Sequence, residues 1–219
     1  MNIFDIVGPI MVGPSSSHTA GAVKIGYVAR KLLTQPVTDA TINMYGSFLA
    51  TGGGHGTKYA LVAGLLGMLP DDEHIPDSFR YADEAGMKYR FGEADLKDVH
   101  PNSVQMILRG ADGHSLEVVG ESLGGSLINI VQVDGLSANF SGEYPTLIVY
   151  NEDRPGHVAE VTKMLADRDI NIATLKLYRG GRGKNAVMVI ECDQEIPQES
   201  ILWLEKREGI EKVTYYSLL

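Results

Sequence analysis

Two stretches of the chain combine glycine, hydroxyl and histidine side chains directly before a predicted helix. The first is VGPSSSHTAG, residues 12–21, and the second is TGGGHGTK, residues 51–58. The N-terminus of a helix leaves backbone N–H groups without partners and carries partial positive charge, so a carboxylate or phosphate binds there readily. A histidine at such an end tends to stay neutral, and a neutral imidazole can accept a proton. Together the stretches predict a small-anion site with a proton acceptor.

The residues of this predicted site fall into two groups. The proton acceptors are His18 and His55, and the binding groups are Ser15, Ser16, Ser17, Thr19 and Gly54. A purely structural interpretation stays open, because one serine can be a helix N-cap and the glycines can simply allow a tight turn. Nucleotide binding is not supported, since the second stretch matches neither a P-loop nor a dinucleotide fingerprint. The repetition of the same combination favours one shared site.

Two further stretches could contribute to it. GESLGGSLINIVQV, residues 120–133, is either a turn that contacts substrate or a β-bulge, and the bulge is favoured. HPNS, residues 100–103, predicts a turn that leaves His100 available. No closely spaced set of histidines and carboxylates of the HExxH kind is present, so we expect no metal site built by this chain alone.

The front part of the chain predicts an α+β domain that carries these loops. Helical spacing of apolar residues indicates a helix over 19–33, and a run of small and apolar residues indicates a buried helix over 57–69. Strands are expected at 39–46, 87–91, 103–110, 114–120 and 127–135. The turn-rich stretch 137–145 then indicates a linker, so we predict domains over 1–143 and 144–219.

The rear part predicts the split β-α-β-β-α-β order of a ferredoxin-like sandwich. Strands are expected at 146–150, 171–179, 185–192 and 210–219, and helices after the NEDRPG turn and over 197–209. The glycine turn at 180–184 joins the two middle strands.

Bulk composition excludes several classes of protein. The chain has 219 residues, a net charge of -9 and a pI of about 5.1, which disfavours nucleic acid and anionic membranes as partners. It shows neither a basic secretory leader nor an apolar run long enough to cross a membrane, so we expect a cytoplasmic location. The single cysteine, Cys192, excludes an internal disulfide and a thiolate-held iron-sulfur cluster built by this chain alone.

The sequence resembles a known family over essentially its whole length. FDIVGPIMVGPSSSHTAGAVKIG, GSFLATGGGHGTKYALVAGLLG and HPNS are similar to the β chain of two-chain, iron-sulfur-dependent L-serine dehydratases. Residues 147–179 resemble an ACT domain. The resemblance implies that the front domain is related to the allosteric substrate-binding domain of some phosphoglycerate dehydrogenases. The front motifs are specific to the dehydratase family, whereas the ACT motif occurs in many amino-acid-regulated proteins.

The resemblance implies a lyase of amino-acid catabolism and gluconeogenesis that converts L-serine to pyruvate and ammonia. It implies a [4Fe-4S] cluster ligated by a partner α chain, with His55 favoured over His18 as the acceptor of the α-proton. In the rear domain it implies an effector-binding loop with a possible monovalent cation and a homodimer through the ACT domain. The loop residues are Asn151, Asp153, Pro155 and Gly156. The alternative is a regulatory, amino-acid-sensing and dimerisation subunit without catalytic residues.

Overall fold

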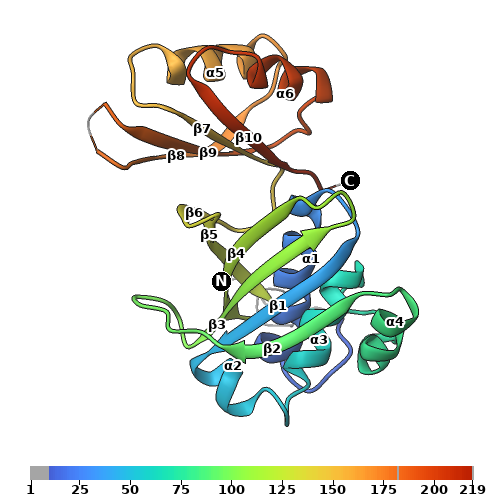
Figure 1. Cartoon of the computed structure of the whole chain (residues 1–219). Helices are drawn as coiled ribbons and strands as arrows, with labels where there is room; N and C mark the ends of the chain where they lie inside the picture. The colour runs from blue at the N-terminus through green and yellow to red at the C-terminus, as the bar shows by residue number, and fades with distance from the viewer. Residues whose placement is uncertain (1–9, 182, 219) are drawn as a thin grey trace. The chain divides into compact units, whose positions relative to one another are not determined.

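The structure is a computed structural model that describes residues 10–181 and 183–218 (Figure 1). It divides the chain into two compact units, Met1–Gly135 and Leu136–Leu219. The predicted division at 143 falls inside the second unit, after strand β6 (Leu136–Phe140), which occupies part of the stretch that indicated a linker. The beginning of the first family-like motif, residues 4–9, lies outside the described residues.

The first unit consists of a mixed sheet and a set of helices. Its strands are β1 (Val37–Tyr45), β2 (Lys88–Glu93), β3 (Asn102–Gly110), β4 (Ser115–Gly124) and β5 (Leu127–Val133). They lie in the order β2-β1-β3-β4-β5, with β1 and β2 parallel and the other pairs antiparallel. The helices are η2 (Ser16–Gly21), α1 (Ala22–Leu33), α2 (Gly46–Thr51), α3 (Thr57–Leu66), η3 (Ile75–Asp77) and α4 (Ser78–Glu84).

Helices α1 and α3 pack closely together, and α1 also contacts β3, β4 and β5 (Figure 1). Two glycines allow this approach. A Cβ added to Gly64 would lie 2.1 Å from the Val23 carbonyl oxygen, and one added to Gly26 would lie 2.5 Å from the Leu61 carbonyl oxygen. The crossing therefore has room only for glycine at these positions.

Most of the predicted elements of the first unit are confirmed. The strands agree within a few residues, and α3 is buried along most of its length, as its small and apolar residues predicted. The predicted helix over 19–33 begins earlier, because a π-helical turn, η2, precedes α1. Helices α2 and α4 were not predicted, and both are short.

The second unit has the predicted β-α-β-β-α-β order after β6. Its elements are β7 (Thr146–Glu152), α5 (His157–Ala166), β8 (Ile172–Arg179), β9 (Asn185–Cys192), α6 (Gln198–Glu205) and β10 (Ile210–Tyr216). The antiparallel sheet has the order β10-β7-β9-β8. Apolar residues of β7 and β9 pack against α5 and α6 to form the core. This arrangement confirms the ferredoxin-like prediction.

No helix in the described part of the chain is both long and apolar enough to cross a membrane.

Candidate functional site

The two histidine loops of the first unit meet in the structure. Ser15 is the N-cap of η2, and its Oγ accepts a hydrogen bond from the His18 backbone N–H at 3.2 Å. The Thr19 hydroxyl donates to the His55 carbonyl oxygen at 3.3 Å, which ties the first loop to the second. The His18 and His55 ring centroids lie 5.2 Å apart. The juxtaposition expected from the sequence is therefore present.

The two histidines have different surroundings. Both ring nitrogens of His18 have hydroxyl partners: Nδ1 lies 3.0 Å from Ser17 Oγ, and Nε2 lies 3.0 Å from Ser47 Oγ. Its ring also meets that of Phe48 edge-on, at a centroid distance of 5.3 Å. His55 is exposed, and no described residue forms a hydrogen bond with its ring. Of the two rings, His55 is the one open to a ligand.

His18 is held in its neutral form mainly by burial. Burial lowers the pKa of His18 from its ordinary value, the charge of a protonated His55 lowers it further, and hydrogen bonding with Ser47 opposes both. From the sequence, the helix N-terminus is the expected cause of this neutrality. The structure gives desolvation as the larger cause, because the ring is packed between η2 and α2 rather than exposed at a helix end.

Strand β4 ties the first loop to the HPNS turn. The buried Ser122 hydroxyl donates to the Ser17 carbonyl oxygen at 2.9 Å, and its neighbour Glu121 accepts from the His100 backbone N–H at 2.8 Å. The β4–β5 register shifts between Ser122 and Gly124, so the predicted bulge in this stretch is present. The bulge thus lies beside the site and helps to hold its loops.

The HPNS turn also reaches α2. The Ser47 backbone N–H donates to the Pro101 carbonyl oxygen at 2.8 Å, next to the Ser47 hydroxyl that contacts His18. Sequence reasoning missed Ser47, and it singled out the stretch 120–133 without naming Glu121 or Ser122 within it. Ser47 lies within the family-like motif GSFLATGGGHG, which was the one available signal for it. Ser16 lies in the first turn of η2, and Gly54 is exposed beside His55.

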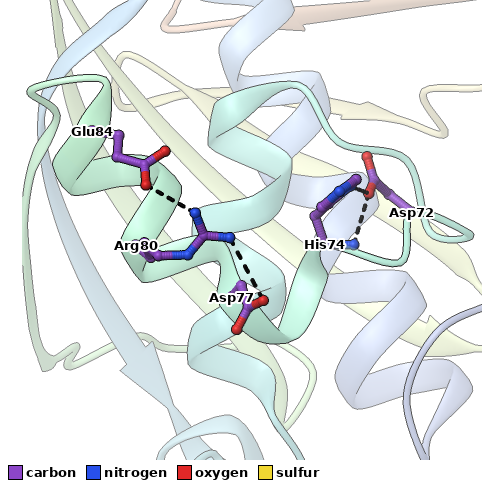
Figure 2. A network of polar contacts seen from close by, with 5 residues as sticks. All are labelled: Asp72, His74, Asp77, Arg80 and Glu84. Carbon is purple, nitrogen blue, oxygen red and sulfur yellow. Dashed lines mark hydrogen bonds and ion pairs between the residues drawn. The ribbon is translucent and has the colours of Figure 1, made fainter.

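A separate set of polar contacts lies on the segment that follows α3 and on α4 (Figure 2). His74 Nδ1 lies 2.8 Å from a carboxylate oxygen of Asp72, and Arg80 pairs with Asp77 and Glu84. The His74 side chain is 49% exposed. Its ring nitrogen is engaged in these contacts, so we do not include His74 in the site.

The predicted effector loop of the second unit joins β7 to α5. The carboxylate of Asp153 accepts hydrogen bonds from the Arg179 side chain and, at 3.0 Å, from the Gly183 backbone N–H. Asn151 is 3% exposed, and its buried Oδ1 has no hydrogen-bond partner among the described residues. Pro155 and Gly156 are exposed. The loop is therefore fastened to the β8–β9 hairpin through Asp153, while Asn151 keeps an unused acceptor.

The described residues do not fit an iron-sulfur cluster. Cys192 is fully buried, and burial raises the pKa of its thiol to about 11, so it is neither accessible nor deprotonated at neutral pH. Within residues 10–181 and 183–218, no group of three or more histidine, cysteine, aspartate or glutamate side chains is arranged to hold a metal ion.

Comparison with known proteins defines the class of each unit. Residues 2–85 match the family model of the serine dehydratase beta chain, and residues 145–201 match the ACT domain. A D-3-phosphoglycerate dehydrogenase of Methanocaldococcus jannaschii is 30% identical over 116 residues, which cover 48% of this chain and 22% of that protein. The chain thus combines a serine dehydratase β domain with an ACT domain, as the resemblance implied.

Relatives that match nearly the full length show the family. The probable L-serine dehydratase β chain of Bacillus subtilis (strain 168) is 38% identical over 97% of this chain and 96% of its own length. The L-serine dehydratase β chain of Peptoniphilus asaccharolyticus is 37% identical over 93% of both chains. The protein belongs to the L-serine dehydratase β-chain family.

Proposed function

We propose that this chain is a subunit of an iron-sulfur L-serine ammonia-lyase and contributes its histidine and hydroxyl loops to a site shared with a cluster-bearing α chain. The observation that carries the proposal is the meeting of His18 and His55, with ring centroids 5.2 Å apart, among the hydroxyls of the first loop. The β-chain names of the full-length relatives support a partner chain. By itself, the chain is expected to be inactive.

The reaction needs a base for the α-proton and groups that hold the substrate. His55 is the proposed base, because its ring is exposed and has no hydrogen-bond partner among the described side chains. Loss of the α-proton and of the β-hydroxyl leaves an enamine, which tautomerises to an imine and is hydrolysed to pyruvate and ammonia. Ser15, Ser16, Ser17, Thr19 and Gly54 are proposed to position the substrate.

Reconstitution tests whether the chain shares in catalysis. Serine-dependent pyruvate formation should be measured anaerobically for this chain alone, for the α chain alone, and for the assembled pair. The proposal predicts activity only for the pair. If the α chain alone turned over serine at the rate of the pair, the shared site would be wrong and the regulatory alternative would be favoured.

The second candidate function is regulation through the ACT domain. The buried, unpartnered Oδ1 of Asn151 suits a monovalent cation or the ammonium group of an amino acid, and it is the observation that favours an effector at this loop. Titration calorimetry with L-serine and with K⁺ tests this, with Asn151→Ala as the variant that should lose the heat signal. Equal binding to the variant and to the original chain would exclude the loop as the effector site.

We also propose a homodimer through the ACT domain. Its sheet ends in β8, an edge strand with Leu175 and Leu177 37% and 43% exposed, and such edges are commonly covered by a second copy. Light scattering at micromolar concentration should give twice the mass of 23.8 kDa. A monodisperse monomer would contradict the proposal.

A further inference from the structure

Four side chains at the centre of the site form an unbroken series of hydrogen-bonding contacts. Ser15 Oγ lies 3.3 Å from Ser17 Oγ, Ser17 Oγ lies 3.0 Å from His18 Nδ1, and His18 Nε2 lies 3.0 Å from Ser47 Oγ. The series joins the first loop to the start of α2 through both ring nitrogens of one imidazole.

The backbone fixes Ser47 at the end of this series. Gly46, with a φ of +55°, turns the chain out of β1, and a Cβ there would lie 2.5 Å from the Pro101 carbonyl oxygen. The Ser47 N–H donates to that same oxygen, and the Ser47 carbonyl accepts from the Thr51 hydroxyl at 2.8 Å. These contacts fix the Ser47 backbone where β1 ends and α2 begins, and from there the Ser47 hydroxyl lies 3.0 Å from His18 Nε2.

An imidazole placed between two hydroxyls can pass a proton. A neutral ring has one N–H donor and one acceptor nitrogen, so it can take a proton at one nitrogen and release one from the other. Burial lowers the pKa of His18, which favours the neutral ring. The one titratable ring in contact with it among the described residues is His55, and Phe48 covers another side with an apolar surface.

Dehydration of a β-hydroxy amino acid removes one proton from the α-carbon and needs another on the departing hydroxyl. We propose that Ser47, His18, Ser17 and Ser15 form a relay that supplies this second proton, and that Ser47 is a further residue of the site. Ser15 Oγ–H donates its proton to the departing hydroxyl oxygen, Ser17 reprotonates Ser15, and His18 Nδ1–H reprotonates Ser17. Ser47 Oγ–H then gives a proton to His18 Nε2, and solvent reprotonates Ser47. The C–O bond breaks with its electron pair on oxygen, and water leaves. This inference rests on the proposed function. His55 removes the α-proton as the base, and the relay supplies the proton for the departing hydroxyl.

The structural part of the relay can be tested on the full chain without any turnover. In ¹⁵N-detected NMR of the imidazole nitrogens, Ser47→Ala should shift the His18 Nε2 resonance and alter its tautomer balance, whereas Ser47→Thr, which keeps a hydroxyl, should retain the original signals. Ser137→Ala, an exposed serine of β6, is the matched control. Unchanged His18 signals in Ser47→Ala would overturn the inference, whatever the activity of the enzyme.

The chemical part is tested on the assembled pair. Ser47→Ala should lower kcat by about 100-fold or more with a KM within about threefold of the original, and should change the solvent deuterium isotope effect and the pH profile of kcat, since general acid–base groups contribute about 10²–10⁴-fold. Ser47→Thr should restore most of the rate. A normal kcat and isotope effect in Ser47→Ala would refute the relay and leave the proposed function intact. If the pair formed by the unmodified chain and the α chain were inactive, the proposed function would be refuted instead. The NMR experiment would still show whether Ser47 and His18 are hydrogen-bonded.

Discussion

Replacement of Gly64 by alanine should separate the two helices that carry the histidine loops. The added Cβ would lie 2.1 Å from the Val23 carbonyl oxygen, 2.7 Å from the Tyr27 backbone nitrogen and 2.9 Å from Gly26 Cα. All three are backbone atoms, so no flexible side chain can give way. To move from 2.1 Å to the 3.4 Å of ordinary contact, α3 must retreat from α1 by about 1.3 Å.

The energetic effect follows from two opposing terms. Overpacking of a filled contact costs about 1–3 kcal/mol, and alanine in place of glycine within a helix returns about 1 kcal/mol. We expect the upper end of the first range because the clash is between backbones, which leaves a loss of roughly 2 kcal/mol in the free energy of unfolding. The free energy of unfolding falls by about 1–3 kcal/mol for each molar of urea, so the urea concentration at the midpoint of unfolding should fall by roughly 1 M.

Urea unfolding followed by circular dichroism measures this shift. Gly53→Ala is the matched control, because a Cβ there has no atom within 4 Å and its φ is not left-handed. The same separation should displace His18 from His55, and displacements near 1 Å can cost about 100-fold in rate. If Gly64→Ala and Gly53→Ala unfolded at the same urea concentration, the account of the helix crossing would be refuted.

Three further predictions concern individual buried groups. Ser122→Ala should lower the free energy of unfolding by about 1 kcal/mol, because the Ser17 carbonyl loses its donor; an unchanged urea midpoint would contradict this contact. The Cys192 thiol, with a pKa of about 11, should not react with an aromatic disulfide at pH 8 until the chain is unfolded in urea, so rapid reaction of the folded chain would show that the thiol is accessible. Burial opposes ionisation of Glu191, but hydrogen bonds from Thr174 and Ser141 outweigh it and lower its pKa. Its contribution to stability should therefore be complete above the unfolded value of 4.5 and be lost as the pH falls below it. Glu191→Gln should make the free energy of unfolding less dependent on pH in this acidic range, whereas Glu143→Gln should leave that dependence unchanged.

The second unit was predictable from sequence because each of its elements carries its own signal. The helix pattern of Val161, Met164 and Leu165 and the apolar run of β9 report burial directly, and glycine turns mark the connections. Helix α4 in the first unit has no such signal, since Ser78 and Ala82 are its only buried residues. Local patterns therefore reveal an element only where it buries a recognisable face.

The candidate site shows the same limit. Glycine, hydroxyl and histidine before a helix indicated His18 and His55, because that combination is local in sequence. The partners that organise them are distant: Ser47 is 29 residues from His18, and Ser122 is 105 residues from Ser17. A serine in a strand or a turn carries no sign of which loop it will meet, so these contacts required the fold. The burial that keeps His18 neutral is likewise a tertiary effect.

The role of His55 as the base is tested most directly by its replacement in the assembled enzyme. Serine-dependent pyruvate formation should be measured anaerobically for the pair with His55→Ala and for the pair with His114→Ala, an exposed turn histidine that serves as the control, after complex formation has been confirmed for both. The account predicts that the His55→Ala pair assembles but loses at least about 100-fold in kcat, whereas the His114→Ala pair keeps the original rate. An assembled His55→Ala pair with normal turnover would contradict it.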